Sequence, residues 1–202
     1  MSKSLFAKKW LHGTDSKFNN WQLPPPFDTT KLVKHSGIFF TSNIDFAQAA
    51  GKNIAEVKIK ENSKILNTLE DKYASEELRT KLCKNAFFDA LLNSKKDIWH
   101  NGWQDGSVLR PIIQENTFAA YKYTERYKFN LTKYGPDSTK FATGHELTRE
   151  LIELICSGAK DMGFDGIYGH EIDRWTNDKK IVAQPWLCIF NENCITEPNW
   201  LG

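Results

Sequence analysis

Short segments with a two-residue period characterise the first third of the chain. Hydrophobic and charged residues alternate over 55–60 (AEVKIK), which predicts a half-buried strand. The compact apolar run at 37–41 (GIFFT) predicts another strand. Three prolines within 23–27 (LPPPF) predict a loop, because proline lacks an N–H donor and fixes φ. Start and stop signals around 45–50 (DFAQAA) predict a short helix directly after the 37–41 strand.

The middle of the chain begins with a helical period and then loses it. Apolar residues recur at steps of three and four from 75 to 93, which predicts an amphipathic helix. No sustained pattern follows, so we interpret 68–140 as an insertion or elaboration of one domain that spans 1–202. Basic and aromatic residues interleave over 121–134 (YKYTERYKFNLTKY). Two interpretations of 121–134 stay open: a strand pair with one solvated face, or a surface that binds an acceptor.

The last third predicts one long helix and a buried strand. Thr143 and Glu146 have the spacing of a capping box, and apolar residues continue on one face over 144–162. Gly163 is placed to end this helix. An apolar run at 186–190 (WLCIF) then predicts a strand.

Composition and charge are those of an ordinary soluble domain. The 202 residues include 27 Lys+Arg and 25 Asp+Glu, and 40% are hydrophobic. A net charge of +2 gives no global attraction for nucleic acid or an anionic membrane, so such a partner would need a local patch. The sequence has neither a secretory signal nor an apolar run of about 18 residues, so we expect a cytoplasmic protein with no membrane partner.

Familiar metal-binding and nucleophilic motifs are missing from the sequence. The four cysteines have no CxxC pair and no metal-like spacing, so we expect reduced thiols and no metal site. His145 and His170 each precede a glutamate, but both lack the second histidine of an HExxH site. Phosphate-binding glycine loops and a GxSxG elbow are also missing, and the cysteines lack the context of catalytic thiols.

Three motifs in a fixed order carry a resemblance to a known family. They are Leu11–Thr14 (LHGT), Gly37–Ser42 (GIFFTS) before a short helix, and Gly163–Ile167 (GFDGI) leading to Trp186–Asn191 (WLCIFN). This set resembles the ADP-ribosyltransferases of the poly(ADP-ribose) polymerase and diphtheria-toxin-like branch. The resemblance covers both ends of the chain and not its middle. It implies an α+β fold with a split, mostly antiparallel pair of β-sheets and flanking helices.

The resemblance also implies an activity. The expected protein is a mono-ADP-ribosyltransferase that uses NAD as substrate and moves ADP-ribose to a macromolecular acceptor, protein or nucleic acid. Single-domain members imply a toxin or effector of bacterial or phage type, with delivery into a target or host cell left open. Two alternatives stay open: an NAD glycohydrolase, in which water replaces the acceptor, and a non-catalytic module that binds NAD or nucleic acid.

Cleavage of the bond between nicotinamide and ribose sets the chemistry that such a site must supply. The sugar becomes oxocarbenium-like, so the site must hold the nicotinamide amide and the ribose hydroxyls and tolerate positive charge. His12 can bond a ribose hydroxyl, Gly13 can bring its backbone to the carboxamide, and Phe39 offers a ring face. Because strand side chains alternate, either Phe39 or Phe40 packs in the core while the other lines a cleft. By the resemblance, the candidate NAD-binding residues are His12, Gly13, Thr14, Phe39, Ser42 and Gln184, and His12 is also a catalytic candidate.

The expected catalytic acid departs from the family pattern. The family's tyrosine falls on Phe39, and its late-strand glutamate falls on Trp186, which leaves no carboxylate there. Candidate acids then lie on the preceding strand or loop, at Glu171 and Asp173. We favour Glu171, although a spacing of two residues does not separate it from Asp173. Gln184 is a further candidate on the Trp186 face of its strand.

Overall fold

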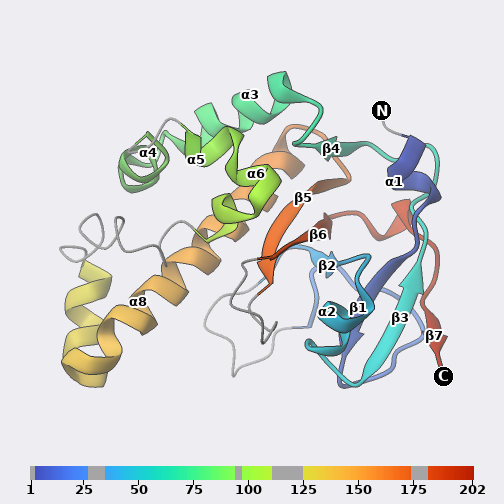
Figure 1. Cartoon of the computed structure of the whole chain (residues 1–202), viewed down its shortest axis with the longest axis horizontal. Helices are drawn as coiled ribbons and strands as arrows, with labels where there is room; N and C mark the ends of the chain where they lie inside the picture. The colour runs from blue at the N-terminus through green and yellow to red at the C-terminus, as the bar shows by residue number, and fades with distance from the viewer. Residues whose placement is uncertain (1–2, 27–34, 94–96, 111–124, 174–181) are drawn as a thin grey trace.

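Two β-sheets are built from segments near both ends of the chain and lie next to each other (Figure 1). The computed structural model describes residues 3–26, 35–93, 97–110, 125–173 and 182–202. The smaller sheet has the strand order β1-β3-β7, and the larger sheet has the order β2-β6-β5-β4. The strands are β1 (Trp10–Thr14), β2 (Ile38–Phe40), β3 (Asn53–Val57), β4 (Ile65–Asn67), β5 (Gly166–Asp173), β6 (Val182–Ile189) and β7 (Asn199–Leu201).

Most neighbouring strands run antiparallel. β1 pairs with β3, β3 with β7, β2 with β6 and β5 with β6 in this way, whereas β4 and β5 are parallel. The two sheets meet where Leu11 of β1 exchanges backbone hydrogen bonds of 2.7 and 2.9 Å with Thr41. The structure therefore confirms the α+β class, with one antiparallel sheet and one mixed sheet.

The larger sheet is buried on both faces because its side chains alternate between two hydrophobic layers. Leu187 of β6 packs toward the smaller sheet in one core cluster with Trp10. Its neighbour Trp186 packs on the opposite face, in a cluster that includes Leu151 of a long helix. The molecule thus has three layers: the smaller sheet, the larger sheet and a layer of helices.

Helices cover the outer face of the larger sheet, and one short helix flanks β1 (Figure 1). That short helix is α2 (Ile44–Gln48), which confirms the helix expected at 45–50. The helices of the outer layer are α3 (Lys72–Leu82), α4 (Ala86–Asn93), α5 (Asp97–His100), α6 (Gly102–Asp105) and α8 (Glu125–Asp161), with the 3₁₀ turn η1 (Ser107–Leu109). The short helix α1 (Lys3–Ala7) and the 3₁₀ turn η4 (Glu192–Cys194) pack instead in the cluster between the two sheets. In the part of the chain that the structure describes, none of these helices is long and apolar enough to cross a bilayer.

The single helix predicted over 75–93 is in fact two helices, α3 and α4. The chain leaves the first helix after Leu82, and the side chain of Asn85 starts the second. Oδ1 of Asn85 accepts hydrogen bonds from the backbone N–H groups of Phe87 and Phe88, at 3.0 and 3.4 Å. An amide side chain in this role is an N-cap, so a new helix begins here. The apolar period continues across the break, and for that reason it did not reveal the break.

The helix predicted over 144–162 is the second part of α8. The backbone of α8 leaves the helical conformation at Gly135 (φ 73°, ψ 172°), beside Pro136, which cannot donate a backbone hydrogen bond. The predicted end is confirmed, because Gly163 follows the helix with a φ of +84°.

The first part of α8 corrects two sequence-based predictions. Residues 125–134 are helical, so the strand-pair interpretation is wrong for them, and 121–124 lie outside the described residues. The capping box is also wrong. Buried Asn130 donates to Oγ1 of Thr143 and Oε2 of Glu146, at 3.1 Å each. Thr143 and Glu146 therefore tie two helical segments together instead of starting a helix.

Candidate functional site

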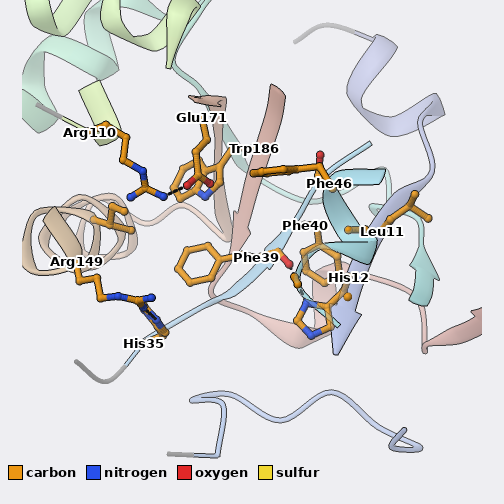
Figure 2. Close-up of a pocket in the computed structure, with 15 residues that line it drawn as sticks. Leu11, His12, His35, Phe39, Phe40, Phe46, Arg110, Arg149, Glu171 and Trp186 are labelled. Carbon is orange, nitrogen blue, oxygen red and sulfur yellow. Dashed lines mark hydrogen bonds and ion pairs between the residues drawn. The ribbon is translucent and has the colours of Figure 1, made fainter. Parts of the chain in front are cut away.

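A cavity of about 340 Å³ lies beside the junction of the two sheets (Figure 2). Its walls come from β1 and β2, from α2 and α8, from β5 and β6 and from Arg110 after η1. This volume lies at the lower end of the range for small-molecule sites, which begins at about 300 Å³. Four of the residues singled out in the sequence line the cavity together: His12, Gly13, Phe39 and Glu171.

The backbone of Gly13 points into the gap between the two sheets. Leu11 directs its N–H and C=O to Thr41, and the peptide groups two residues further along a strand point to the same edge. Gly13 therefore presents one donor and one acceptor at the cavity. A side chain does not fit here, because a Cβ atom would lie 1.8 Å from the backbone oxygen of Ala47 in α2.

Phe39 and Trp186 form an aromatic wall of the cavity (Figure 2). Their rings are stacked at an angle of 30°, with centroids 5.8 Å apart, and the His35 ring meets Phe39 edge-on at 5.0 Å. Phe40 is only 3% exposed and packs in the core between the sheets. The two phenylalanines thus pack on opposite faces of their strand, as the two-residue period predicts, and Phe40 also borders the cavity.

Glu171 projects from β5 and forms an ion pair with Arg110 at the cavity wall (Figure 2). Nη2 of Arg110 donates to Oε1 of Glu171, and each side chain is 13% exposed. Partial burial strengthens such a pair relative to one in water, because the local dielectric constant is lower. The structure therefore places the favoured acid at the cavity with one of its two oxygens bound.

A second guanidinium group, that of Arg149 on α8, also lines the cavity. Its Nε donates to Nε2 of His145 at 2.9 Å, and its Nη1 donates to Nε2 of His35 at 3.1 Å. A guanidinium can only donate, so both Nε2 atoms act as acceptors and both rings are neutral in this arrangement. Two histidines therefore set the direction of Arg149.

His12 joins β1 to β2 next to the cavity. Its Nδ1 donates to the backbone oxygen of Phe39 at 2.9 Å, because a carbonyl can only accept. The ring packs against Trp21 and Phe40, with centroid distances of 5.5 and 5.7 Å. In a neutral ring bound in this way, Nε2 is the hydrogen-bond acceptor.

Four sequence candidates lie outside the set of described residues that line the cavity. Thr14 ends β1, and Ser42 directly precedes the α2 cap. Oε1 of Gln184 accepts a hydrogen bond of 2.9 Å from Asn43, the N-cap residue of α2, so Gln184 ties β6 to that helix. Asp173 is the last residue of β5, and its side chain lies outside the described part of the structure.

Three polar residues of the cavity were not predicted from the sequence: Arg110, Arg149 and His35. Arg110 falls in the region that we interpreted as an insertion, and His35 precedes β2 without any motif. Arg149 follows His145 by four residues, a spacing that places both on one helix face. This spacing was the signal available in the sequence, and it does not reveal which face meets the cavity.

Cys188 and Cys194 have the opposite properties to catalytic thiols. Cys83, Cys156, Cys188 and Cys194 are all unbridged. Burial raises the pKa of Cys194 to about 12 and raises the pKa of Cys188 well above its usual value of 9.0. A nucleophilic cysteine needs a lowered pKa. Among the described residues, no three His, Cys, Asp or Glu side chains are grouped to hold a metal ion.

Comparison with known proteins does not assign this chain to a family. No protein-family model matches the chain, and no curated protein matches it. A solved structure described as the crystal structure of an anti-CRISPR protein aligns over 96% of this chain and 98% of that chain, with 12% sequence identity and a TM-score of 0.35. A TM-score this low does not establish a shared fold.

Proposed function

We propose that this protein is a mono-ADP-ribosyltransferase, which moves ADP-ribose from NAD to a protein or nucleic-acid acceptor. The observation that carries the proposal is the convergence of His12, Gly13, Phe39 and Glu171 on one cavity. These residues belong to β1, β2 and β5, which are distant in the sequence. The presence of two sheets, with most neighbouring strands antiparallel, also supports the proposal.

The nicotinamide end of NAD fits the edge of β1. Its carboxamide carries one N–H₂ donor group and one C=O acceptor, which complement the C=O and N–H of Gly13. The ring of Phe39 stands at the same cavity and supplies an apolar surface for the nicotinamide ring. Glycine at position 13 therefore serves two purposes, since it also lets α2 pack against β1.

Glu171 supplies the charge that the reaction requires. When the bond between the ribose C1′ and nicotinamide breaks, nicotinamide leaves with the bonding electrons and the sugar becomes positively charged. A carboxylate beside the sugar stabilises that charge, and it can also orient the acceptor that then bonds to C1′ and loses a proton. His12 lines the same cavity, and the sequence resemblance gives it the role of binding a ribose hydroxyl.

The size of the cavity matches part of NAD. About 340 Å³ holds the nicotinamide and its ribose, and the remainder of a dinucleotide must extend beyond it. Arg149 lies on the α8 side of this cavity, where a guanidinium group favours the anionic diphosphate. The cavity thus combines a carboxylate for the sugar with a cation for the phosphates.

Incubation with NAD labelled on its adenine, with and without cell lysate, tests this function. Label that becomes covalently attached to protein or nucleic acid supports transfer and identifies the acceptor class. Release of free ADP-ribose instead supports the glycohydrolase. Intact NAD in the presence of lysate contradicts both and leaves a binding module.

Two variants connect the assay to the site. Glu171→Gln should lower turnover by about 10²- to 10³-fold, the typical cost of losing one preorganised electrostatic contact in a transition state. Asp173→Asn should stay near the wild-type rate and serves as the matched control, because it neutralises a carboxylate on the same strand. Full activity of Glu171→Gln with loss of activity in Asp173→Asn would move the acid to Asp173.

A further inference from the structure

The segment from Gly102 to Arg110 lies directly on β5, the strand that carries Glu171. The Trp103 ring packs on the strand, since a Cβ atom at Gly169 would lie 2.5 Å from that ring. One residue further along each segment, Nδ1 of His170 donates to the backbone oxygen of Gln104 at 2.8 Å. This segment belongs to the region that the sequence resemblance does not cover.

The contact continues to the backbone of Glu171 itself. Gly106 has a φ of +80°, which L-residues with a side chain rarely adopt. A Cβ atom there would lie 2.5 Å from the backbone carbon of Glu171. Glycine at 106 therefore lets the segment turn sharply and rest on the strand at the acid.

Arg110 completes this set of contacts by reaching the carboxylate. The residue follows the η1 turn, and its Nη2 binds Oε1 of Glu171. The backbone of Glu171 is thus held at Gly106 and its side chain at Arg110, by two residues of one short segment. Both charged side chains are only 13% exposed, so water competes weakly with the pair.

We propose that Arg110 is a positioning residue for Glu171: it holds Oε1 so that Oε2 faces the sugar in the cavity. The inference rests on the proposed function. Arg110 acts through Glu171 and not on the substrate. A charge-assisted bond of this kind fixes the orientation of the carboxylate before the substrate arrives.

Steady-state kinetics with NAD test this role. Arg110→Met should lower kcat by about 10- to 100-fold and leave KM within about threefold, because a misplaced acid affects the transition state more than the bound substrate. Arg110→Lys should recover part of kcat, since it restores the charge without the planar fork. Arg79→Met is the matched control, because Arg79 makes a 2.9 Å ion pair with Glu76 on α3, away from the cavity, and should keep the wild-type kcat.

Each outcome decides the inference. A wild-type or increased kcat in folded Arg110→Met overturns it, and an increase would mark the ion pair as an inhibitory contact. Should Arg110→Met fail to fold, Arg110→Gln keeps an N–H donor without the charge, and a wild-type kcat in that variant overturns the inference equally. No NAD turnover by the wild-type protein overturns the proposed function as well, whereas normal wild-type turnover with an unaffected variant overturns only the role of Arg110.

Discussion

The guanidinium group of Arg149 reaches the cavity with its direction already fixed by two neutral histidines, His35 and His145. Preorganisation of this kind lowers the entropic cost of binding an anion, because the long side chain is ordered before the ligand arrives. The side chain is therefore well placed to bind the phosphates of NAD.

Loss of this cation should weaken NAD binding. Charge-assisted hydrogen bonds contribute about 1.5 to 3 kcal/mol, so Arg149→Met should raise KM for NAD by about 10- to 100-fold and change kcat less. The KM of Arg149→Lys should lie between those of the wild-type protein and Arg149→Met, because lysine keeps the charge but lacks the bidentate fork. Lys160→Met, at the exposed far end of α8, serves as the control. An unchanged KM in Arg149→Met would contradict phosphate binding at this position.

Strand residues of the cavity could be predicted, and its helix and loop residues could not. The two-residue period separates Phe39 from Phe40, and it places Glu171 on one face of a strand. Arg149 reaches the cavity because α8 packs near β2, and His35, which it contacts there, is 114 residues away in the sequence. Arg110 reaches the cavity from the end of η1, which follows the helices α3 to α6 in the chain. Long-range packing of this kind leaves no local pattern in the sequence.

At the scale of an element, α8 shows why the apolar period is an incomplete guide. The period located the second part of the helix correctly, because that part buries an apolar face that includes Leu151. The first part, 125–134, buries a polar residue instead, Asn130, which is fully buried. A helix held by a buried amide has no apolar stripe, so the alternation of aromatic and basic residues suggested strands.

The buried amide of Asn130 should hold the two parts of α8 together. Asn130→Ala removes donors from Thr143 and from the Glu146 carboxylate, and leaving buried polar groups unsatisfied costs about 1 to 3 kcal/mol each. We expect faster hydrogen exchange of the backbone amides of 125–134, with little change in the β-strands. Thr132→Ala, an exposed position in the same segment, should leave exchange unchanged. Equal protection in Asn130→Ala and wild type would show that other contacts hold the segment.

At the scale of the whole molecule, the described strands come from 10–67 and 166–201, and the elements among the described residues between them are helices. Each motif at the two ends includes residues of a strand, so the sequence pattern located parts of β1, β2, β5 and β6. The helical layer could not be predicted in the same detail. Its contacts with the sheet depend on aromatic packing such as that between Trp103 and Trp186, whose centroids are 6.4 Å apart.

Three buried titratable groups, Cys188, Cys194 and Tyr168, should make the whole protein less stable at alkaline pH. Burial raises the pKa of Cys194 from 9.0 to about 12, and it also raises the pKa values of Cys188 and of Tyr168. In each case the folded state favours the neutral form, while the unfolded chain ionises at the ordinary value. The free energy of unfolding should therefore be constant below about pH 9 with respect to these groups and should fall as the pH rises toward about 12.

Urea unfolding at several pH values between 7 and 11, in the presence of a reducing agent, measures this dependence. The wild-type protein should lose stability progressively above about pH 9. Cys194→Ala removes the group with the raised value of about 12, so its stability should fall less steeply over the same interval. Cys83→Ala is the matched comparison: burial also raises the pKa of this thiol, but Cys83 is partly exposed and should contribute less to the slope. Parallel curves for Cys194→Ala and wild type would show that Cys194 ionises alike in the folded and unfolded chain, and alkaline destabilisation would then have to come from other groups of the core.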